Sequence, residues 1–197
     1  MTAISRGRRS RASWLCLALA ACGGHAGGGA KPVDPSAVRI VPLAAAIVLE
    51  TAGPPPSDTS VTFPAGAPRT IVLRHGPPEN VVFAELSFAP GAFRADSGRP
   101  VTVRVRPRPG VYGLELSASA PFGDGASVVF KYARYFLAPA RARARYGSDV
   151  EYERALAIGQ LMPAGPSLAL QPSTRPAADN LQAAVPAPGT YLVAAPE

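Results

Sequence analysis

Cysteine is scarce in this chain and is confined to its first residues. Only Cys16 and Cys22 occur among 197 residues, so residues 23–197 cannot form a disulfide bond or a cysteine-based metal site in any redox compartment. The single tryptophan, Trp14, lies in the same N-terminal segment. The stability of the remaining chain must therefore come from burial of apolar side chains.

Histidine is equally rare, and its scarcity limits the possible chemistry. The chain holds only His25 and His75, with no His pair and no Asp-rich calcium loop, so we expect no metal site. A Ser-His-Asp site would have to use His75, and no Gly-x-Ser-x-Gly motif supplies a nucleophile. We interpret His75 as a loop residue near solvent and His25 as solvated. We expect neither a catalytic centre nor a cofactor.

Long hydrophobic runs are missing as well. The apolar run Trp14–Ala21 covers eight residues, whereas a membrane-spanning helix needs about 20. It follows a segment that contains Arg6, Arg8, Arg9 and Arg11 and no acidic residue. A basic segment followed by a short apolar run is typical of a signal peptide.

The end of this run, Leu19-Ala20-Ala21-Cys22, resembles the lipobox of bacterial lipoproteins. The resemblance implies removal of residues 1–21, acylation of the Cys22 thiol and attachment of the mature protein to a cell-envelope membrane by its acyl chains, which would be its only prosthetic group. The alternative is an ordinary secretory signal with Cys22 unmodified. By analogy with lipoproteins of Gram-negative bacteria, Gly23 in place of an inner-membrane Asp favours the outer membrane.

The segments after Cys22 divide into a tether and one domain. Residues 22–36 are rich in Gly and Ala, then Pro, which predicts a flexible spacer. Residues 37–197 have the length of a single domain. Without its four signal-peptide arginines the chain falls from twenty basic residues to sixteen, against thirteen acidic ones, a net charge of +3. So small an excess indicates no nucleic-acid partner.

Proline and alternating residue patterns predict an all-β domain. All 23 prolines lie between Pro32 and Pro196, and proline disrupts helix interiors. Val101–Arg106 (VTVRVR) alternates valine with a polar, partly basic face, and the turn 107–110 leads to a second alternating run, 112–120, which together predict a hairpin. Further strands are expected over residues 38–43, 47–51, 60–63, 70–74, 81–88, 127–136, 181–185 and 190–195.

Two segments are harder to interpret. Residues 140–146 (ARARARY) would, as a strand, align Arg141, Arg143 and Arg145 in one basic stripe, which is either edge protection or a contact for anionic lipid. Residues 148–162 fit a helix capped by Ser148 or a strand that forms a hairpin with 167–171. We favour the strand.

The predicted strands indicate a fold but no specific activity. Pro188-Gly189-Thr190-Tyr191 echoes Pro109-Gly110-Val111-Tyr112, and Tyr191 resembles the tyrosine corner of immunoglobulin-like domains, although the Cys and Trp landmarks of that family are missing. We therefore expect an antiparallel two-sheet sandwich of immunoglobulin-like architecture, with a β-barrel as the alternative.

Three functions remain open. The first is a non-catalytic, lipid-anchored module that binds or scaffolds other envelope proteins. The second is a carrier for a small or lipidic ligand, and the third is an envelope hydrolase that would use His75 or the acids near Asp149.

Overall fold

Alternating apolar and polar residues build two antiparallel sheets. The computed structural model describes residues 37–197, which fall in one compact unit. The predicted signal peptide, the lipidation site Cys22 and the tether 22–36 lie outside the described residues. The strands are β1 (Arg39–Pro42), β2 (Ala46–Val48), β3 (Glu50–Thr51), β4 (Thr59–Pro64), β5 (Arg69–Arg74), β6 (Val82–Phe88), β7 (Pro100–Pro107), β8 (Gly113–Ala118), β9 (Ala126–Lys131), β10 (Phe136–Leu137), β11 (Ala157–Leu161), β12 (Ser167–Leu170), β13 (Asn180–Ala184) and β14 (Gly189–Pro196).

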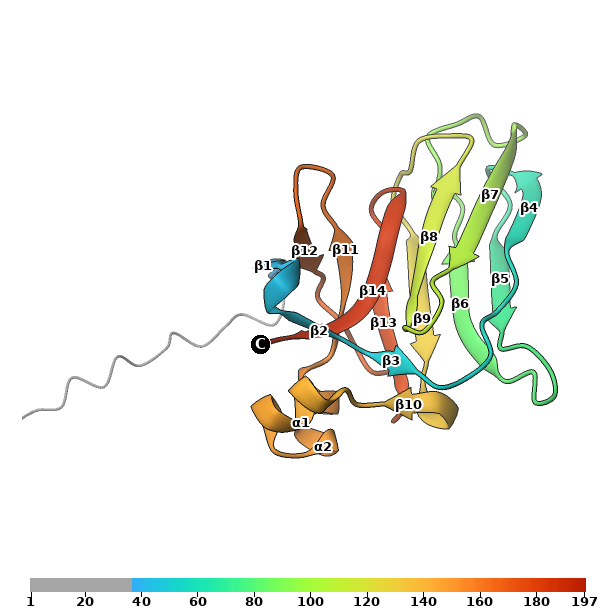
Figure 1. Cartoon of the computed structure of the whole chain (residues 1–197). Helices are drawn as coiled ribbons and strands as arrows, with labels where there is room; N and C mark the ends of the chain where they lie inside the picture. Colours follow the sequence, from blue (N-terminus) through green and yellow to red (C-terminus); the bar gives the residue numbers. More distant parts are fainter. Residues whose placement is uncertain (1–36) are drawn as a thin grey trace, which may run out of the picture. The chain divides into compact units, whose positions relative to one another are not determined.

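The large sheet has the order β1-β12-β11-β14-β8-β7-β4, with β2 also paired to β14, and the small sheet has the order β13-β9-β6-β5. Figure 1 shows the two sheets packed face to face, with β3 and β10 forming a short ribbon near the helices. Within residues 37–197 no strand pairing joins the large sheet to the small one, so the β-barrel alternative is wrong and the predicted sandwich is confirmed. With eight and four strands, these sheets exceed the four and three of a constant immunoglobulin domain.

The core between the sheets is rich in aromatic side chains. Val101, Val103 and Val105 of β7 are fully buried, as their alternation predicts. One aromatic group joins Phe63, Phe88, Phe93 and Phe122 by ring contacts. A second group links Phe83, Phe130, Tyr112, Tyr132, Phe136, Tyr152 and Tyr146. We call the buried residues between the two sheets, which include both aromatic groups, the main core.

The predicted hairpin 101–120 forms as β7 and β8, in the register Val105↔Leu116. The predicted strand 127–136, by contrast, ends at Lys131 and continues as a 3₁₀ turn, Ala133–Tyr135, before β10. The turn redirects the chain out of the small sheet, so Arg134, which interrupts the apolar pattern, marks the change of direction.

Residues 140–146 do not form the strand that was considered for them. They form helix α1 (Ala140–Tyr146), which begins after Pro139 and ends at Gly147. Gly147 has a φ of 75° and its N–H donates to the Arg143 carbonyl, the geometry of a glycine helix cap. Alanine favours a helix, and with no partner strand alongside, the Ala-Arg alternation carries no sheet information.

Residues 148–162 divide between both interpretations. Helix α2 (Asp149–Ala155) is capped by Ser148, whose Oγ accepts a hydrogen bond from the Glu151 N–H at 3.2 Å. The chain then forms β11, which pairs with β12 in the predicted hairpin. The favoured strand is therefore wrong for the first half of the segment and confirmed for the second.

Candidate functional site

The outer face of the large sheet, turned away from the main core, divides into two halves. On β4, β7 and β8 the outward side chains are polar or charged: Ser60, Thr62, Thr102, Arg104, Arg106, Glu115 and Ser117. On β14, β11 and β12 they are apolar: Leu192, Ala194, Ala157, Leu161, Leu168 and Leu170. A sheet face with this division offers an amphipathic surface at the boundary.

The apolar half is covered by the start of the domain. The segment 39–48, which we call the strap, runs from β1 through the 3₁₀ turn Leu43–Ala45 into β2. Its first strand pairs with β12 and its last pairs with β14, and the Leu43 N–H donates to the Pro166 carbonyl at 2.7 Å. Val41, Ala46 and Val48 of the strap therefore enclose a second, aliphatic cluster with the apolar half of the sheet.

Two glycines let this second cluster pack directly on the sheet. A Cβ at Gly159 would lie 2.4 Å from Leu168 Cγ, and a Cβ at Gly113 would lie 2.5 Å from Leu192 Cδ2. Real Cβ atoms do not approach other atoms so closely, so these leucines lie flat over the two backbone positions. Gly113 thereby fixes the place of Leu192 at the edge of the cluster.

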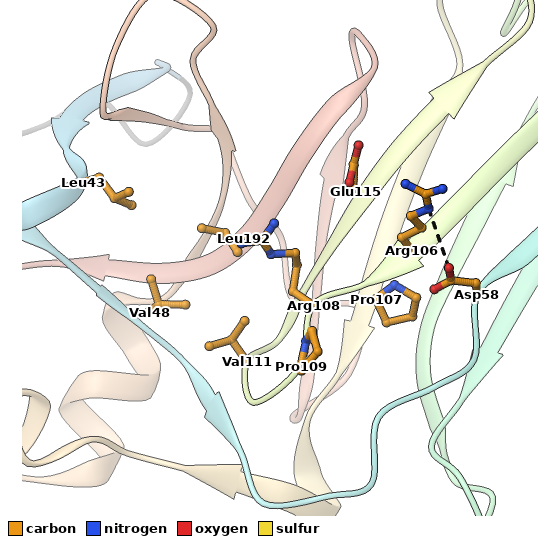
Figure 2. A pocket seen from close by; sticks show the side chains of 10 residues that line it. All are labelled: Leu43, Val48, Asp58, Arg106, Pro107, Arg108, Pro109, Val111, Glu115 and Leu192. Atoms are coloured by element: carbon orange, nitrogen blue, oxygen red, sulfur yellow. Dashed lines mark ion pairs between the residues drawn. The ribbon is translucent and has the colours of Figure 1, made fainter.

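A groove of about 590 Å³ lies where the cluster meets the polar half of the sheet. Its apolar wall comes from the strap, from the β7–β8 turn and from β14, and its charged wall comes from β7, β8 and the segment before β4. Figure 2 shows the lining side chains, which are Leu43, Val48, Val111, Leu192, Pro107, Pro109, Arg106, Arg108, Asp58 and Glu115. We call this site the groove.

The charges in the groove are only partly neutralised. Arg106 forms a salt bridge with Asp58 at 3.6 Å, between two largely exposed side chains, and lies opposite Glu115 in the β7–β8 register. Neither Arg108 nor Glu115 forms a salt bridge within residues 37–197. In Figure 2 Arg108 lies between the apolar side chains and the charged ones. The groove therefore presents a cation and an anion beside an apolar wall.

The three arginines of α1 do not form the predicted stripe. Arg141 donates to Glu197 at 2.7 Å and to the Ala44 carbonyl at 3.0 Å, whereas Arg143 pairs with Asp149 at 3.0 Å. Arg145 lies over the Tyr146 ring, 5.6 Å from its centroid. On a helix, residues 141 and 145 share a face and residue 143 does not. Two of the guanidinium groups thus hold α1 against neighbouring segments.

The two tyrosines singled out in the sequence make different contacts. The Tyr191 hydroxyl donates to the Ala187 carbonyl, four residues upstream, at 2.6 Å, which is the contact that defines a tyrosine corner. The Tyr112 hydroxyl donates instead to the Tyr132 carbonyl, on the small-sheet side, at 3.3 Å. Burial raises the pKa of each phenol to about 12, so both stay protonated donors over the physiological pH range.

The prediction that His75 lies near solvent is wrong. Its side chain is 1% exposed, and it contacts the rings of Phe83, Tyr112 and Tyr135 at centroid distances of 5.2, 6.1 and 4.7 Å. Nδ1 lies 2.8 Å from the Pro54 carbonyl, and because a carbonyl only accepts, Nδ1–H is the donor. Nε2 has no hydrogen-bond partner among the described residues. His75 is a core residue that fastens residue 54 to β5.

An exposed ion cluster covers this histidine. Arg134 donates to both carboxylate oxygens of Glu79, at 2.6 and 2.7 Å, and the Tyr135 hydroxyl donates to the same carboxylate at 2.7 Å. These hydrogen bonds lower the pKa of Glu79 to about 2. The cluster therefore anchors Tyr135, the ring nearest to His75.

The acids near Asp149 do not converge on His75. Asp149 pairs with Arg143, Glu151 pairs with Arg154 at 2.6 Å, and Glu153 accepts from the Tyr132 hydroxyl at 3.1 Å. Over residues 37–197 no three His, Cys, Asp or Glu side chains gather closely enough to hold a metal ion. No described helix has the length and hydropathy to cross a bilayer.

Sequence reasoning missed the groove because its lining comes from four segments that are far apart in the chain, namely 43–48, Asp58, 106–115 and Leu192. The basic outer face of β7 was visible in the VTVRVR pattern, and Arg106 belongs to it. Nothing in the sequence indicated that the strap would return to β14 and bring Leu43 and Val48 beside Arg108.

Comparison of the chain with protein-family models, with curated proteins and with solved structures finds no match.

Proposed function

We propose that this protein is a lipid-anchored component of the cell envelope that binds a segment of another envelope protein in the groove. The anchor is inferred from the basic segment, the short apolar run and the lipobox-like residues Leu19-Ala20-Ala21-Cys22. The binding role is inferred from the groove itself.

The observation that carries the binding role is the combination of groups in the groove. Arg108 and Glu115 offer charges of both signs without an ion-pair partner in the domain, next to the side chains of Val111 and Leu192. A polypeptide segment carries acidic, basic and apolar side chains together, so it can satisfy all three kinds of surface. A purely apolar or purely anionic ligand would leave one of the charges desolvated and unpaired.

The openness of the groove also favours a protein segment over an enclosed small ligand. Carrier sites bury most of the ligand surface in a concave, predominantly apolar pocket. Here the groove lies along the outer face of a sheet, with one charged wall, and Figure 2 shows its side chains spread along that face instead of converging. An extended or helical segment laid along the boundary fits this shape.

Photo-crosslinking in cells tests this proposal directly. A crosslinking residue at Val111, inside the groove, should give a discrete protein adduct, and one at Ser117, exposed on the same face but outside the groove, should not. The Cys22→Ala variant should lose the adduct as well, because an unanchored chain would not meet its partner.

A charge variant separates specific binding from chance contact. Arg108→Glu should abolish the Val111 adduct by repelling the acidic group of the partner, whereas Arg104→Glu, four residues earlier on the outer face of β7, should leave it intact. Equal adducts at Val111 and Ser117 would contradict the proposal. So would native mass spectrometry that finds a stoichiometric lipid or small molecule whose binding depends on Arg108, which would instead favour the carrier function.

A further inference from the structure

The described chain begins at an edge strand that leaves apolar side chains in solvent. Val38 and Ile40 are 52% and 60% exposed, with the exposed Arg39 between them. Strand β1 pairs only with β12, so within residues 37–197 its other edge has no partner strand. An exposed, apolar edge is unfavourable in water unless something covers it.

A second exposed cation lies close to this edge. Burial raises the pKa of the Tyr146 phenol, and the positive charges of Arg145 and Arg39 both act against that rise. Arg145 lies over the Tyr146 ring, 5.6 Å from its centroid, and the Tyr146 hydroxyl donates to the Pro196 carbonyl, where β14 pairs with Ala46 of the strap. Helix α1 and strand β1 are held together through the strap, because Arg141 of α1 donates to the Ala44 carbonyl at 3.0 Å.

We call the following side chains the β1 patch: Val38, Arg39, Ile40 and Arg145. Val38 and Ile40 share one face of the extended chain and Arg39 lies on the other, with Val41, so the patch borders the free edge of β1 on both faces. Arg39 and Arg145 form no salt bridge within the described residues. The patch thus combines two exposed aliphatic side chains with two uncompensated positive charges. Arginine presents several donors to phosphate oxygens, and its aliphatic stem can lie along apolar surface.

We infer that the β1 patch rests on an anionic lipid surface and seats the domain on the membrane that carries its anchor. This inference depends on the proposed acylation of Cys22. That residue precedes Val38 by sixteen positions in the sequence, and a flexible Gly-rich tether of that length has a root-mean-square span of roughly 20–24 Å. The proposed anchor therefore joins the domain directly before the β1 patch in the sequence.

The chemistry of the patch favours lipid over a second copy of the chain. A two-fold β1–β1 contact would place both Arg39 charges along one four-residue edge, to which Pro42 donates no backbone N–H, and this is unfavourable. An anionic headgroup layer attracts the same charges, and its acyl boundary accepts the Val38 and Ile40 side chains. A contact of this kind adds to the acyl chains as a second membrane signal.

Vesicle flotation of the non-lipidated mature chain, residues 22–197 with Cys22→Ala, tests the inference. This chain should fold, because both clusters of buried residues come entirely from residues 41–195. We expect binding to vesicles that contain phosphatidylglycerol, little binding to phosphatidylcholine alone, and loss of binding at high salt. Arg39→Gln and Arg145→Gln should each weaken binding about fivefold.

Ile40→Ser should also weaken flotation, and because Ile40 is 60% exposed the substitution should leave the fold intact, which a thermal melt checks. The matched control is Arg69→Gln on β5, the edge strand of the small sheet, which lies beside β4 at the end of the sandwich opposite β1. It should bind like the unmodified chain.

Three results would overturn the inference. They are equal binding to anionic and neutral vesicles, a loss with Arg69→Gln as large as with Arg39→Gln, and a dimer in sedimentation equilibrium that Ile40→Ser dissociates. The mass of the full-length protein extracted from membranes reports acylation of Cys22 separately. A β1 patch that does not bind lipid can therefore be distinguished from a Cys22 that is not acylated.

Discussion

The two clusters of buried residues in this domain differ in composition and in how completely they are covered. The main core lies between the two sheets and is built around phenylalanine and tyrosine rings. The second cluster lies on the outer face of the large sheet and contains only aliphatic side chains. The strand β14 serves both, because Tyr191 and Val193 point into the main core whereas Leu192 and Ala194 point into the second cluster.

The difference shows how one sheet can provide both stability and a binding surface. The main core is covered on both sides by sheets, so its rings are excluded from water. The second cluster is covered only by the strap, which stops at β14 and leaves Leu192 at the edge of the groove. A cover that ends halfway across a sheet face leaves an apolar wall next to a charged one.

Truncating one large side chain in each cluster should give the largest effect on stability and should distinguish the two clusters. Phe130 is fully buried and meets Phe83 edge to face at 5.6 Å, so Phe130→Ala should lower the free energy of unfolding by about 3–5 kcal/mol. Leu192→Ala should cost about 2 kcal/mol or less, because water in the groove can fill the space. Urea unfolding measures both, and equal losses would mean that the second cluster is as closed as the main core.

A small-to-large change tests how tightly the second cluster is packed. Gly159→Ala puts a Cβ within 3 Å of both Leu168 and Leu170, and we expect a loss of about 3 kcal/mol, at the upper end of the range for overpacked sites. Gly98→Ala, where nothing lies within 4 Å of the new Cβ, is the control. If the two variants melt at the same temperature, the second cluster is looser than its geometry indicates.

His75, the one polar or charged residue that is fully buried within residues 37–197 besides the tyrosines, gives the third test. His75→Leu removes the shorter of the two hydrogen bonds to the Pro54 carbonyl and leaves only the one from the Gly76 N–H at 3.4 Å, which should cost about 1 kcal/mol. His75→Gln keeps an N–H donor in reach and should lose less. A leucine variant as stable as the natural protein would show that the His75 contact contributes nothing to the fold.

The smallest expected effect concerns the exposed ion cluster of Glu79, Arg134 and Tyr135 next to His75. The pKa of Glu79 is lowered to about 2 from an ordinary value of 4.5, so its stabilising contribution is complete above about pH 4.5 and is lost as the pH falls toward 2. Glu79→Gln should flatten the dependence of stability on pH in that window. The free energy of unfolding can be measured by circular dichroism at a series of acid pH values. If it changes with pH equally in both proteins, this prediction is refuted.

Local patterns predicted the sandwich, and tertiary contacts decided the rest. The alternation in Val101–Arg106 and the turn after it were sufficient for the β7–β8 hairpin, because period-two burial and a glycine turn are local signals. The same alternation misled in ARARARY, where Gly147 and Pro139 set the limits of a helix. An alternating residue pattern therefore predicts a strand only where another strand lies alongside to pair with it.

The site was less predictable than the fold. His75 is buried by Phe83, Tyr112 and Tyr135, whose positions relative to it follow from strand order and not from spacing along the chain. The groove depends in the same way on the return of the strap to β14. The residues that a sequence reading would select, such as Arg141 and Arg143, proved to be engaged in holding α1.

The position of β14 also has a consequence for the order in which the domain can assemble. Every strand that β14 pairs with, β2, β8 and β11, precedes it in the chain. Until residues 189–196 are present, β1, β12 and β11 have no hydrogen-bonded link to β8, β7 and β4. The large sheet would remain as two separate halves, and a chain emerging from its N-terminus could complete neither cluster of buried residues before its last strand arrived.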